Sequence, residues 1–382
     1  MIQKETALQK IIDVVEDVSF PYQTSDYQED FRDWRRRKQN PYAFRFTKNP
    51  KEATFSESQT LTAQSPAKAE QAVLNRIGTM MGILLLGYLL IENVLDKAVV
   101  LLMRLMHLHI ELVFLGETHL YGDEKLVFWV SFLIHLLKYL VPAVLMQVIL
   151  RLPLRVSLPS TLRNPYHLIP GIVLTMVLSV GMGMVGISHS AELEKYRLIL
   201  STNDTEDKKI IFYILMMIFV IPLVSELLLH GCLFQALRQF GDNFAIVSTV
   251  ILAAVMTHNA PDALRIGLLH LTISYYVIQT GSFGAAVLLR ITHEIYMFAL
   301  FCLESTDNIY SSEWWLMVLI PCALGAVMGI YILLHKKQKA PPIQNQTYLN
   351  MQEKLAAFFT PLPMTAFLIC CVMLLIITSM LR

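Results

Sequence analysis

Three ionisable residues, Glu226, His258 and His293, lie inside long apolar segments of the sequence. On insertion scales a charged side chain at the centre of a bilayer costs about 2.5–3.5 kcal/mol, so such residues usually mark a function. A carboxylate and two imidazoles can transfer protons to and from a water molecule, or they can bind a metal ion. The three residues therefore predict a polar site inside a membrane.

The composition predicts the elements that must hold this site. Of the 382 residues, 55% are hydrophobic and 16% are charged, and the mean hydropathy is +0.51. Apolar runs of 18 or more residues are long enough to cross a bilayer as helices. The sequence thus predicts an all-α, polytopic membrane bundle of about eight or nine transmembrane helices, at 79–103, 126–150, 168–188, 210–238, 244–260, 262–280, 283–303, 314–335 and 361–381.

Four regions follow from this layout. Residues 1–75 form a polar N-terminal region, residues 76–209 and 306–382 hold the outer spans, and residues 210–305 form a core that contains the three ionisable residues. Arginine and lysine in short loops fall on one side if the N-terminus is cytoplasmic, as the positive-inside rule requires. We therefore expect a multi-pass protein with a cytoplasmic N-terminus.

A basic stretch at residues 35–51 is interleaved with the aromatic residues Tyr42, Phe44 and Phe46 and directly follows Trp34. Such a stretch suits the anionic inner surface of a membrane. We expect anionic lipid as its partner. A nucleic acid is not expected, because the net charge of the chain is only +1.

The depth of each ionisable residue can be estimated from the turns at 241–243 and 281–282. At 1.5 Å per residue, Glu226 lies roughly 22 Å, His258 roughly 25 Å and His293 roughly 17 Å from the same face of the membrane. This common depth predicts one shared site. The alternative is that each buried histidine only donates a hydrogen bond to a neighbouring helix and packs there.

His230 follows Glu226 by four residues, so both side chains project from the same face of a helix. Glu226, His230, His258 and His293 could together ligate zinc and leave one position open for water. No cofactor is favoured, because the same residues can also work without a metal, but zinc is possible.

Three segments carry a family resemblance. The segment IPLVSELLLHGCLFQALRQF resembles the first motif of the CPBP family, which contains the type II CAAX prenyl endopeptidases and the bacterial Abi proteins linked to bacteriocin processing and self-immunity. AAVMTHNA resembles the second motif, and GLLHLTISYYVIQTGSFGAAVLLRITHEIYM resembles the third. Order and spacing agree over roughly residues 210–300, which makes 210–305 a CPBP/Abi-like core.

The resemblance implies an intramembrane endopeptidase in a bacterial plasma membrane, acting on a peptide or membrane protein. In this family a first-motif glutamate and the second-motif histidine activate a water, and the third-motif histidine and an asparagine hold the oxyanion. Carried over, Glu226 is the expected base, His258 its partner and His293 the oxyanion contact, with His230, Ser225 and Met297 in supporting positions.

The chain also departs from the family pattern. Ser225 replaces the first glutamate of the motif pair, His230 the arginine, Ala254 the phenylalanine, and Met297 the asparagine. Methionine cannot donate a hydrogen bond. An inactive family member, acting as a self-immunity or scaffold protein, is therefore the alternative. A proton-coupled transporter would also use buried carboxylates and imidazoles, but no repeat relates the two halves of the chain.

Overall fold

Helices dominate the described residues of this computed structural model. It describes residues 20, 22–37, 40–44, 66–108, 110–114, 118–122, 124–163, 165–183, 207–258, 260–305, 312–334 and 347–381. The α-helices are α2 (Ser25–Arg36), α4 (Pro66–Leu90), α5 (Asp96–Leu105), α6 (Glu124–Leu150), α7 (Leu154–Ser157), α8 (Leu168–Gly183), α10 (Asp207–Leu215), α11 (Ile221–Glu226), α12 (Phe234–Leu237), α13 (Asp242–Val255), α14 (Ala260–Thr280), α15 (Phe283–Ser305), α16 (Ser312–Leu334), α17 (Met351–Phe359) and α18 (Leu362–Leu381).

Short segments of other geometry interrupt or connect these helices. Three are π-helical: η1 (Ile91–Leu95), η3 (Met216–Val220) and η4 (Leu227–Leu233). Two are 3₁₀ turns, η2 (Pro165–His167) and η5 (Arg238–Phe240). The strands β1 (Ile110–Phe114) and β2 (Thr118–Gly122) form an antiparallel pair between α5 and α6.

The long helices are apolar enough to cross a membrane. Among the described residues, 4 helices pass by length and hydropathy, or 5 if a helix pair bent by 86° is one span. The four are Ala67–Leu105, Trp129–Leu150, Ile211–Phe240 and Phe283–Leu303, and the bent pair is Met351–Phe359 with Leu362–Ile377. The predicted all-α membrane bundle is confirmed. The predicted eight or nine spans also counted shorter apolar helices such as Pro165–Val180 and Asp242–Val255.

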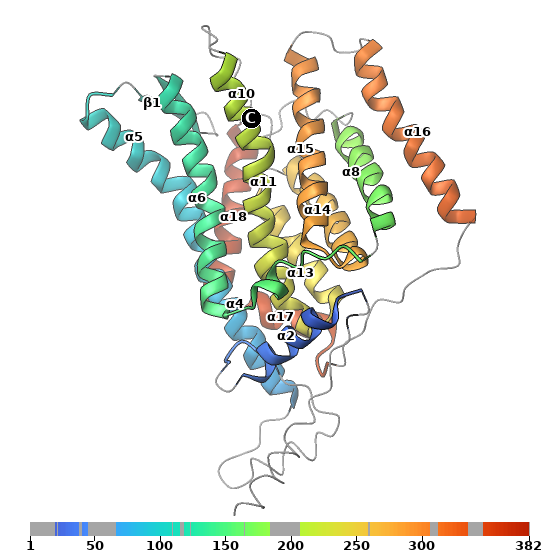
Figure 1. Cartoon of the computed structure of the whole chain (residues 1–382). Helices are drawn as coiled ribbons and strands as arrows, with labels where there is room; N and C mark the ends of the chain where they lie inside the picture. Colours follow the sequence, from blue (N-terminus) through green and yellow to red (C-terminus); the bar gives the residue numbers. More distant parts are fainter. Residues whose placement is uncertain are drawn as a thin grey trace, which may run out of the picture.

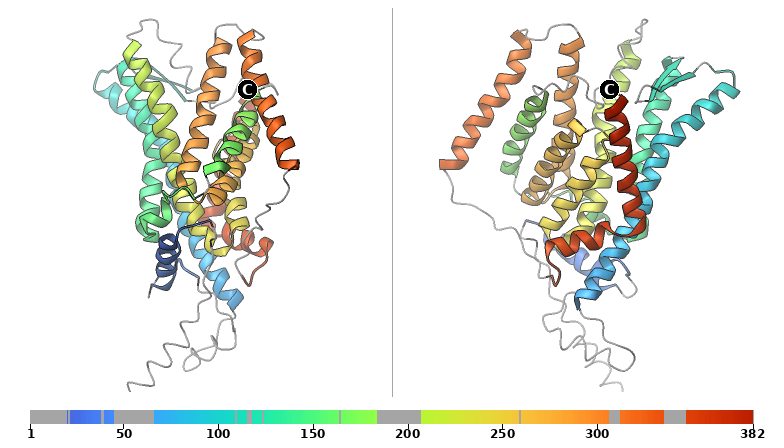
Figure 2. Two further views of the ribbon diagram at one scale, coloured as in Figure 1. Left: turned by 45° about the vertical axis from the view of Figure 1, so that its right-hand side comes forward. Right: turned by 180° about the vertical axis from the view of Figure 1, so that it is seen from behind.

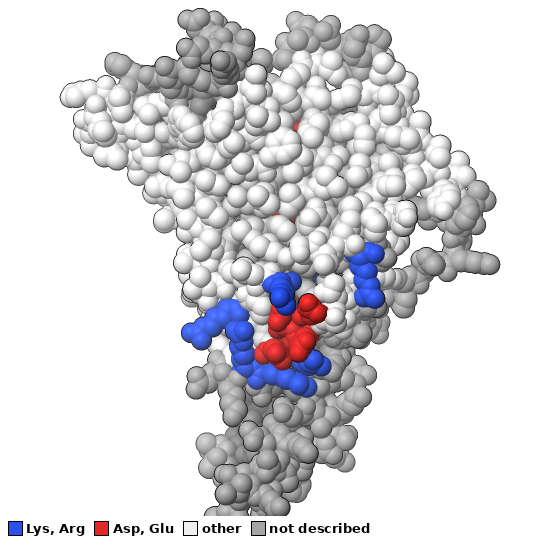
Figure 3. Space-filling view, viewed as in Figure 1, with Lys and Arg blue, Asp and Glu red and all other residues white. Residues whose placement is uncertain are grey.

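Charge is distributed as a membrane protein requires. The long helices run side by side, and α2 lies across one end of the bundle (Figure 1). On the face shown in Figure 3, the charged side chains gather around that end, while the surface above them is almost free of charge. An apolar belt of this kind is suited to contact with lipid.

Two glycines let α4 approach the C-terminal helices closely. A Cβ at Gly78 would meet the carbonyl oxygen of Phe358, and one at Gly82 would meet the backbone nitrogen of Met364. Small residues four apart allow helix backbones to touch in membranes, where packing replaces the hydrophobic effect. Seen from behind, α17 crosses the end of the bundle and α18 runs beside α4 (Figure 2).

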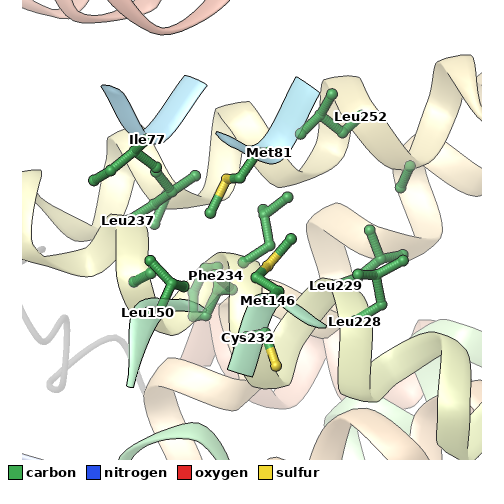
Figure 4. Close-up of a cluster of buried hydrophobic side chains, with 14 of the residues drawn as sticks. Ile77, Met81, Met146, Leu150, Leu228, Leu229, Cys232, Phe234, Leu237 and Leu252 are labelled. Carbon is green, nitrogen blue, oxygen red and sulfur yellow. The ribbon is translucent and has the colours of Figure 1, made fainter. Parts of the chain in front are cut away.

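The largest core cluster forms around η4 and α12. Figure 4 shows side chains from four parts of the bundle meeting there. They are Ile77 and Met81 from α4, Met146 and Leu150 from α6, Leu228, Leu229, Cys232, Phe234 and Leu237 from η4 and α12, and Leu252 from α13. This packing fixes the segment that carries Glu226 and His230.

The N-terminal strap, which we define as the described residues between 20 and 44, is folded onto the bundle. Trp34 is fully buried, and its Nε1 donates to the carbonyl of Leu150 at 2.8 Å. The Tyr27 hydroxyl donates to Gln235 Oε1 at 2.8 Å. Burial raises the pKa of Tyr27 to about 12, against the opposing effect of the neighbouring Arg238. Tyr27 therefore stays protonated as a donor at neutral pH.

The described part of the basic-aromatic stretch at 35–51 packs against protein, whereas the sequence predicted contact with lipid. Trp34 and Phe44 belong to the protein core, and Arg35 is buried with its guanidinium donating to the carbonyl of Phe44 at 2.9 and 3.1 Å. Positions 38–39 and 45–51 of the stretch lie outside the described residues. The described aromatic members thus anchor the strap to protein.

Candidate functional site

Glu226 is the centre of one buried polar group. Its side chain and that of His230 are both 0% exposed, and His230 Nδ1 lies 2.5 Å from Glu226 Oε2. His230 Nε2 lies 2.9 Å from Ser274 Oγ on α14. His270, also on α14, stacks on His230 with ring centroids 5.4 Å apart, and its Nδ1 lies 3.9 Å from Glu226 Oε1. We call these four residues the Glu226 group.

The sequence explains the local geometry of this group. Residues four apart on a helix are neighbours, which brings His230 onto the carboxylate. The π-helical segment η4 begins directly after Glu226 and contains His230, and such segments are frequent at functional sites. Glu226 Oε1 is buried and has no hydrogen-bond partner among the described residues. A buried carboxylate oxygen in this state suits a proton, a water or a cation.

A metal would have to compete with existing hydrogen bonds. The ligand atoms of Glu226, His230 and His270 lie within 4.8 Å of one another. Glu226 and His230 were among the predicted zinc ligands, but the third residue near them is His270 rather than His258 or His293. However, His230 Nδ1 already faces Glu226 and Nε2 already faces Ser274. Zinc needs a free imidazole lone pair, so the residues fit a hydrogen-bonded group better than a zinc site.

We therefore expect the purified protein to contain far less than one zinc per chain. Treatment with a chelator should leave its melting temperature unchanged, because the hydrogen bonds of the Glu226 group do not depend on a metal. Elemental analysis and thermal unfolding in detergent check both points. One zinc per chain that is lost in a His270→Ala variant would contradict this expectation.

A second polar group surrounds His258. Its Nε2 lies 2.8 Å from Glu92 Oε2, and Lys138 Nζ donates to the other oxygen of Glu92 at 2.8 Å. The Tyr88 hydroxyl donates to that same oxygen at 3.1 Å. We call these four residues the Glu92 group. It joins η1, α6 and the turn between α13 and α14 through one carboxylate.

The backbone holds His258 in an uncommon conformation. Its φ is 53°, in the left-handed region, which costs a non-glycine residue about 1–2 kcal/mol. Residues held this way cluster at functional sites. Its side chain is 13% exposed and that of Glu92 is 21% exposed, whereas Glu226 and His230 are 0% exposed. The Glu92 group is therefore the more accessible of the two.

The remaining predicted site residues have partners of their own. His293 is buried on α15, and its Nδ1 lies 2.8 Å from Ser179 Oγ on α8. Ser225 donates to the carbonyl of Pro222 in its own helix at 3.0 Å. Met297 is buried, and its Sδ accepts a hydrogen bond from Arg265 at 3.3 Å.

The structure thus joins some of the predicted residues and separates others. Glu226 and His230 are together as expected. His258 differs from expectation, because its carboxylate partner is Glu92 rather than Glu226. His258 lies before the first residue of α14, while His270 lies about three turns into that helix. The Glu92 group therefore lies next to the start of α14, and the Glu226 group meets this helix about three turns further along.

Sequence reasoning missed Glu92, Lys138 and the role of His270 in the Glu226 group. Glu92 and Lys138 each lie inside a predicted span, 79–103 or 126–150. The criterion that selected Glu226, an ionisable residue within an apolar segment, would also have selected them.

Fold and site together define a polytopic helical membrane protein with ionisable side chains grouped in its interior. Residues 207–296, from α10 into α15, match the family model described as type II CAAX prenyl endopeptidase Rce1-like. The match confirms the resemblance to the CPBP family for this segment. No curated protein and no solved structure matches the chain. Glu226, His258 and His293 lie inside the matched segment, while Glu92 and Lys138 lie outside it.

Proposed function

We propose that the chain is a membrane-embedded peptide hydrolase of the CAAX type. The observation that supports this most directly is His258, an imidazole bonded to a carboxylate inside an apolar bundle and within the matched segment. An imidazole oriented by a carboxylate is a common base for activating a nucleophile. The substrate class, a prenylated peptide or membrane protein, is taken from the description of the family.

In the proposed reaction one water adds across a peptide bond. Its oxygen bonds to the carbonyl carbon, one proton passes to His258, and that proton then passes to the leaving nitrogen as the C–N bond breaks. A carboxylic acid and an amine result. His258 Nδ1 is covered in this structure, so the reacting water enters together with substrate. Catalytic hydrogen bonds often form only in that complex.

The geometry favours His258 over Glu226 as the base. Glu226 is completely buried, and one of its oxygens is already bound by His230. We propose that Glu226 supports the site by holding η4 against α14 through His230 and Ser274. His293 is proposed as the oxyanion contact, which the family resemblance implies.

Anionic lipid remains the proposed partner of the α2 end of the bundle. Arg37, Arg151 and Arg155 are exposed there, and the last of these lies 3.8 Å from Asp26. Exposed arginines at the level of lipid headgroups are attracted to negative lipids.

The proposed function can be tested with the full chain in lipid nanodiscs. The substrate is a fluorescent, internally quenched peptide with a farnesylated CAAX end. We expect the natural chain to cleave it, and the same peptide without farnesyl to be cleaved more slowly. No cleavage of the farnesylated peptide by a folded chain would overturn the proposal.

An inactive family member is the second candidate. It is favoured by Ser225 and Met297, which stand where the family has a carboxylate and an asparagine. If the Ser225→Glu, Met297→Asn double variant cleaves the farnesylated peptide while the natural chain does not, this second candidate is correct.

A further inference from the structure

The two carboxylate oxygens of Glu92 have different partners. Oε1 accepts from Lys138 and Tyr88, while Oε2 faces His258 Nε2. The positive charge of a lysine in contact with a carboxylate stabilises the negative charge of that carboxylate, so the carboxylate stays ionised. An ionised carboxylate accepts hydrogen bonds only. Nε2 of His258 must therefore carry the proton of this hydrogen bond.

That proton determines the chemistry of the other ring nitrogen. In a neutral imidazole one nitrogen donates and the other accepts. With the proton on Nε2, the lone pair lies on Nδ1, which can then accept a proton from water. Fixing the tautomer of a catalytic histidine is the role of the third member of a catalytic triad.

The source of this carboxylate is unexpected. The first motif lacks a carboxylate at Ser225, and the next residue, Glu226, is bound to His230. His258 instead receives its carboxylate from η1, about 110 residues upstream of the matched segment's start. Glu92, like His230, lies in a π-helical turn.

We propose that Glu92 is the positioning residue that fixes the tautomer and orientation of His258, with Lys138 holding Glu92 in its charged form. This inference rests on the proposed function for the role of His258 as base. It adds a residue from outside the matched segment to the reaction centre.

The first test measures cleavage of the farnesylated peptide by Glu92→Gln. The glutamine amide can donate to Nε2 and so favour the wrong tautomer, and we expect kcat to fall about 100-fold or more with KM changed less than about threefold. Glu92→Asp keeps the charge and should recover part of kcat. Natural kcat in Glu92→Gln would overturn the proposal.

A double variant tests whether Glu92 acts through His258. The Glu92→Gln, His258→Ala double variant should be no slower than His258→Ala alone, because residues that act as one unit are not additive. Losses that multiply would show that Glu92 acts elsewhere and would overturn the proposal. The matched control is Glu294→Gln, which removes another buried carboxylate, bound to Arg290 at 2.9 Å. We expect its kcat to stay within about threefold of the natural value.

A spectroscopic test separates this inference from the proposed function. In a chain labelled with ¹⁵N-histidine and held in lipid, the signal of His258 is identified by its loss in His258→Gln. We expect the Nε2-protonated form in the natural chain and in Glu294→Gln, and a shift toward the Nδ1-protonated form in Glu92→Gln. An unchanged tautomer in Glu92→Gln would overturn the inference. If Glu92→Gln shows this shift but the natural chain cleaves no peptide, only the proposed function is overturned.

Discussion

Replacing His258 by alanine is expected to lower kcat for the farnesylated peptide by at least about 100-fold, because general base catalysis contributes about 10²–10⁴-fold. Cleavage in nanodiscs measures kcat, and thermal unfolding shows whether the variant is folded. The contact with Glu92 is lost as well, so a lower melting temperature is expected beside the loss of rate. Activity within tenfold of the natural chain would remove His258 from the reaction.

The matched comparison is Glu226→Gln. The amide keeps the shape of the side chain and can still bond to His230, so we expect this variant to retain much more activity than His258→Ala. If Glu226→Gln is folded and completely inactive while His258→Ala cleaves peptide, the roles of base and support are reversed.

Replacing Arg238 by alanine is expected to lower the free energy of unfolding by about 3–5 kcal/mol, because it leaves the buried Asp242 without its cation. Arg238 Nε donates to Asp242 Oδ1 at 2.7 Å, and both side chains are 2% exposed. The guanidinium also lies over the ring of Phe20, 4.4 Å from its centroid. Equilibrium unfolding in mixed detergent and SDS measures the loss.

The control is a variant that removes both charges, Arg238→Met with Asp242→Leu. Replacing a buried ion pair with apolar residues is often neutral, so the double variant should be more stable than Arg238→Ala. Arg238 also contacts the Tyr27 hydroxyl at 3.3 Å. Both variants lose this contact, so we expect proteolysis of the strap to become faster in each of them. Equal stability of all three proteins would show that the pair contributes nothing measurable.

The sequence was sufficient for the class of fold because hydropathy acts over long segments. The spans at 126–150, 210–238 and 283–303 agree with apolar helices of the structure. The sequence did not predict that the N-terminal strap is folded onto the bundle. Trp34 and Phe44 are flanked by arginines and lysines, and only their contacts with Leu150 and Gln239 show that they are buried. Contacts between residues far apart in sequence have no local signature.

Only the part of the site formed by residues close together in sequence could be predicted. The pairing of Glu226 with His230 follows from their spacing within one helix. The pairing of His258 with Glu92 joins residues 166 positions apart, and no spacing rule connects them. The depth estimate also assumed straight helices of uniform rise, whereas η3 and η4 interrupt the helix that carries Glu226.

The π-helical turns have a consequence for how this protein can change over evolution. Each adds a residue relative to the α-helical repeat, and one residue corresponds to about 100° of rotation about the helix axis. Deleting a single residue from η1 would let this turn rewind to the α-helical repeat and would rotate the residues within it, Glu92 among them, toward different neighbours. Insertions and deletions inside η1, η3 and η4 should therefore be far less tolerated than conservative substitutions at the same positions, and a library of single-residue deletions would reveal the difference.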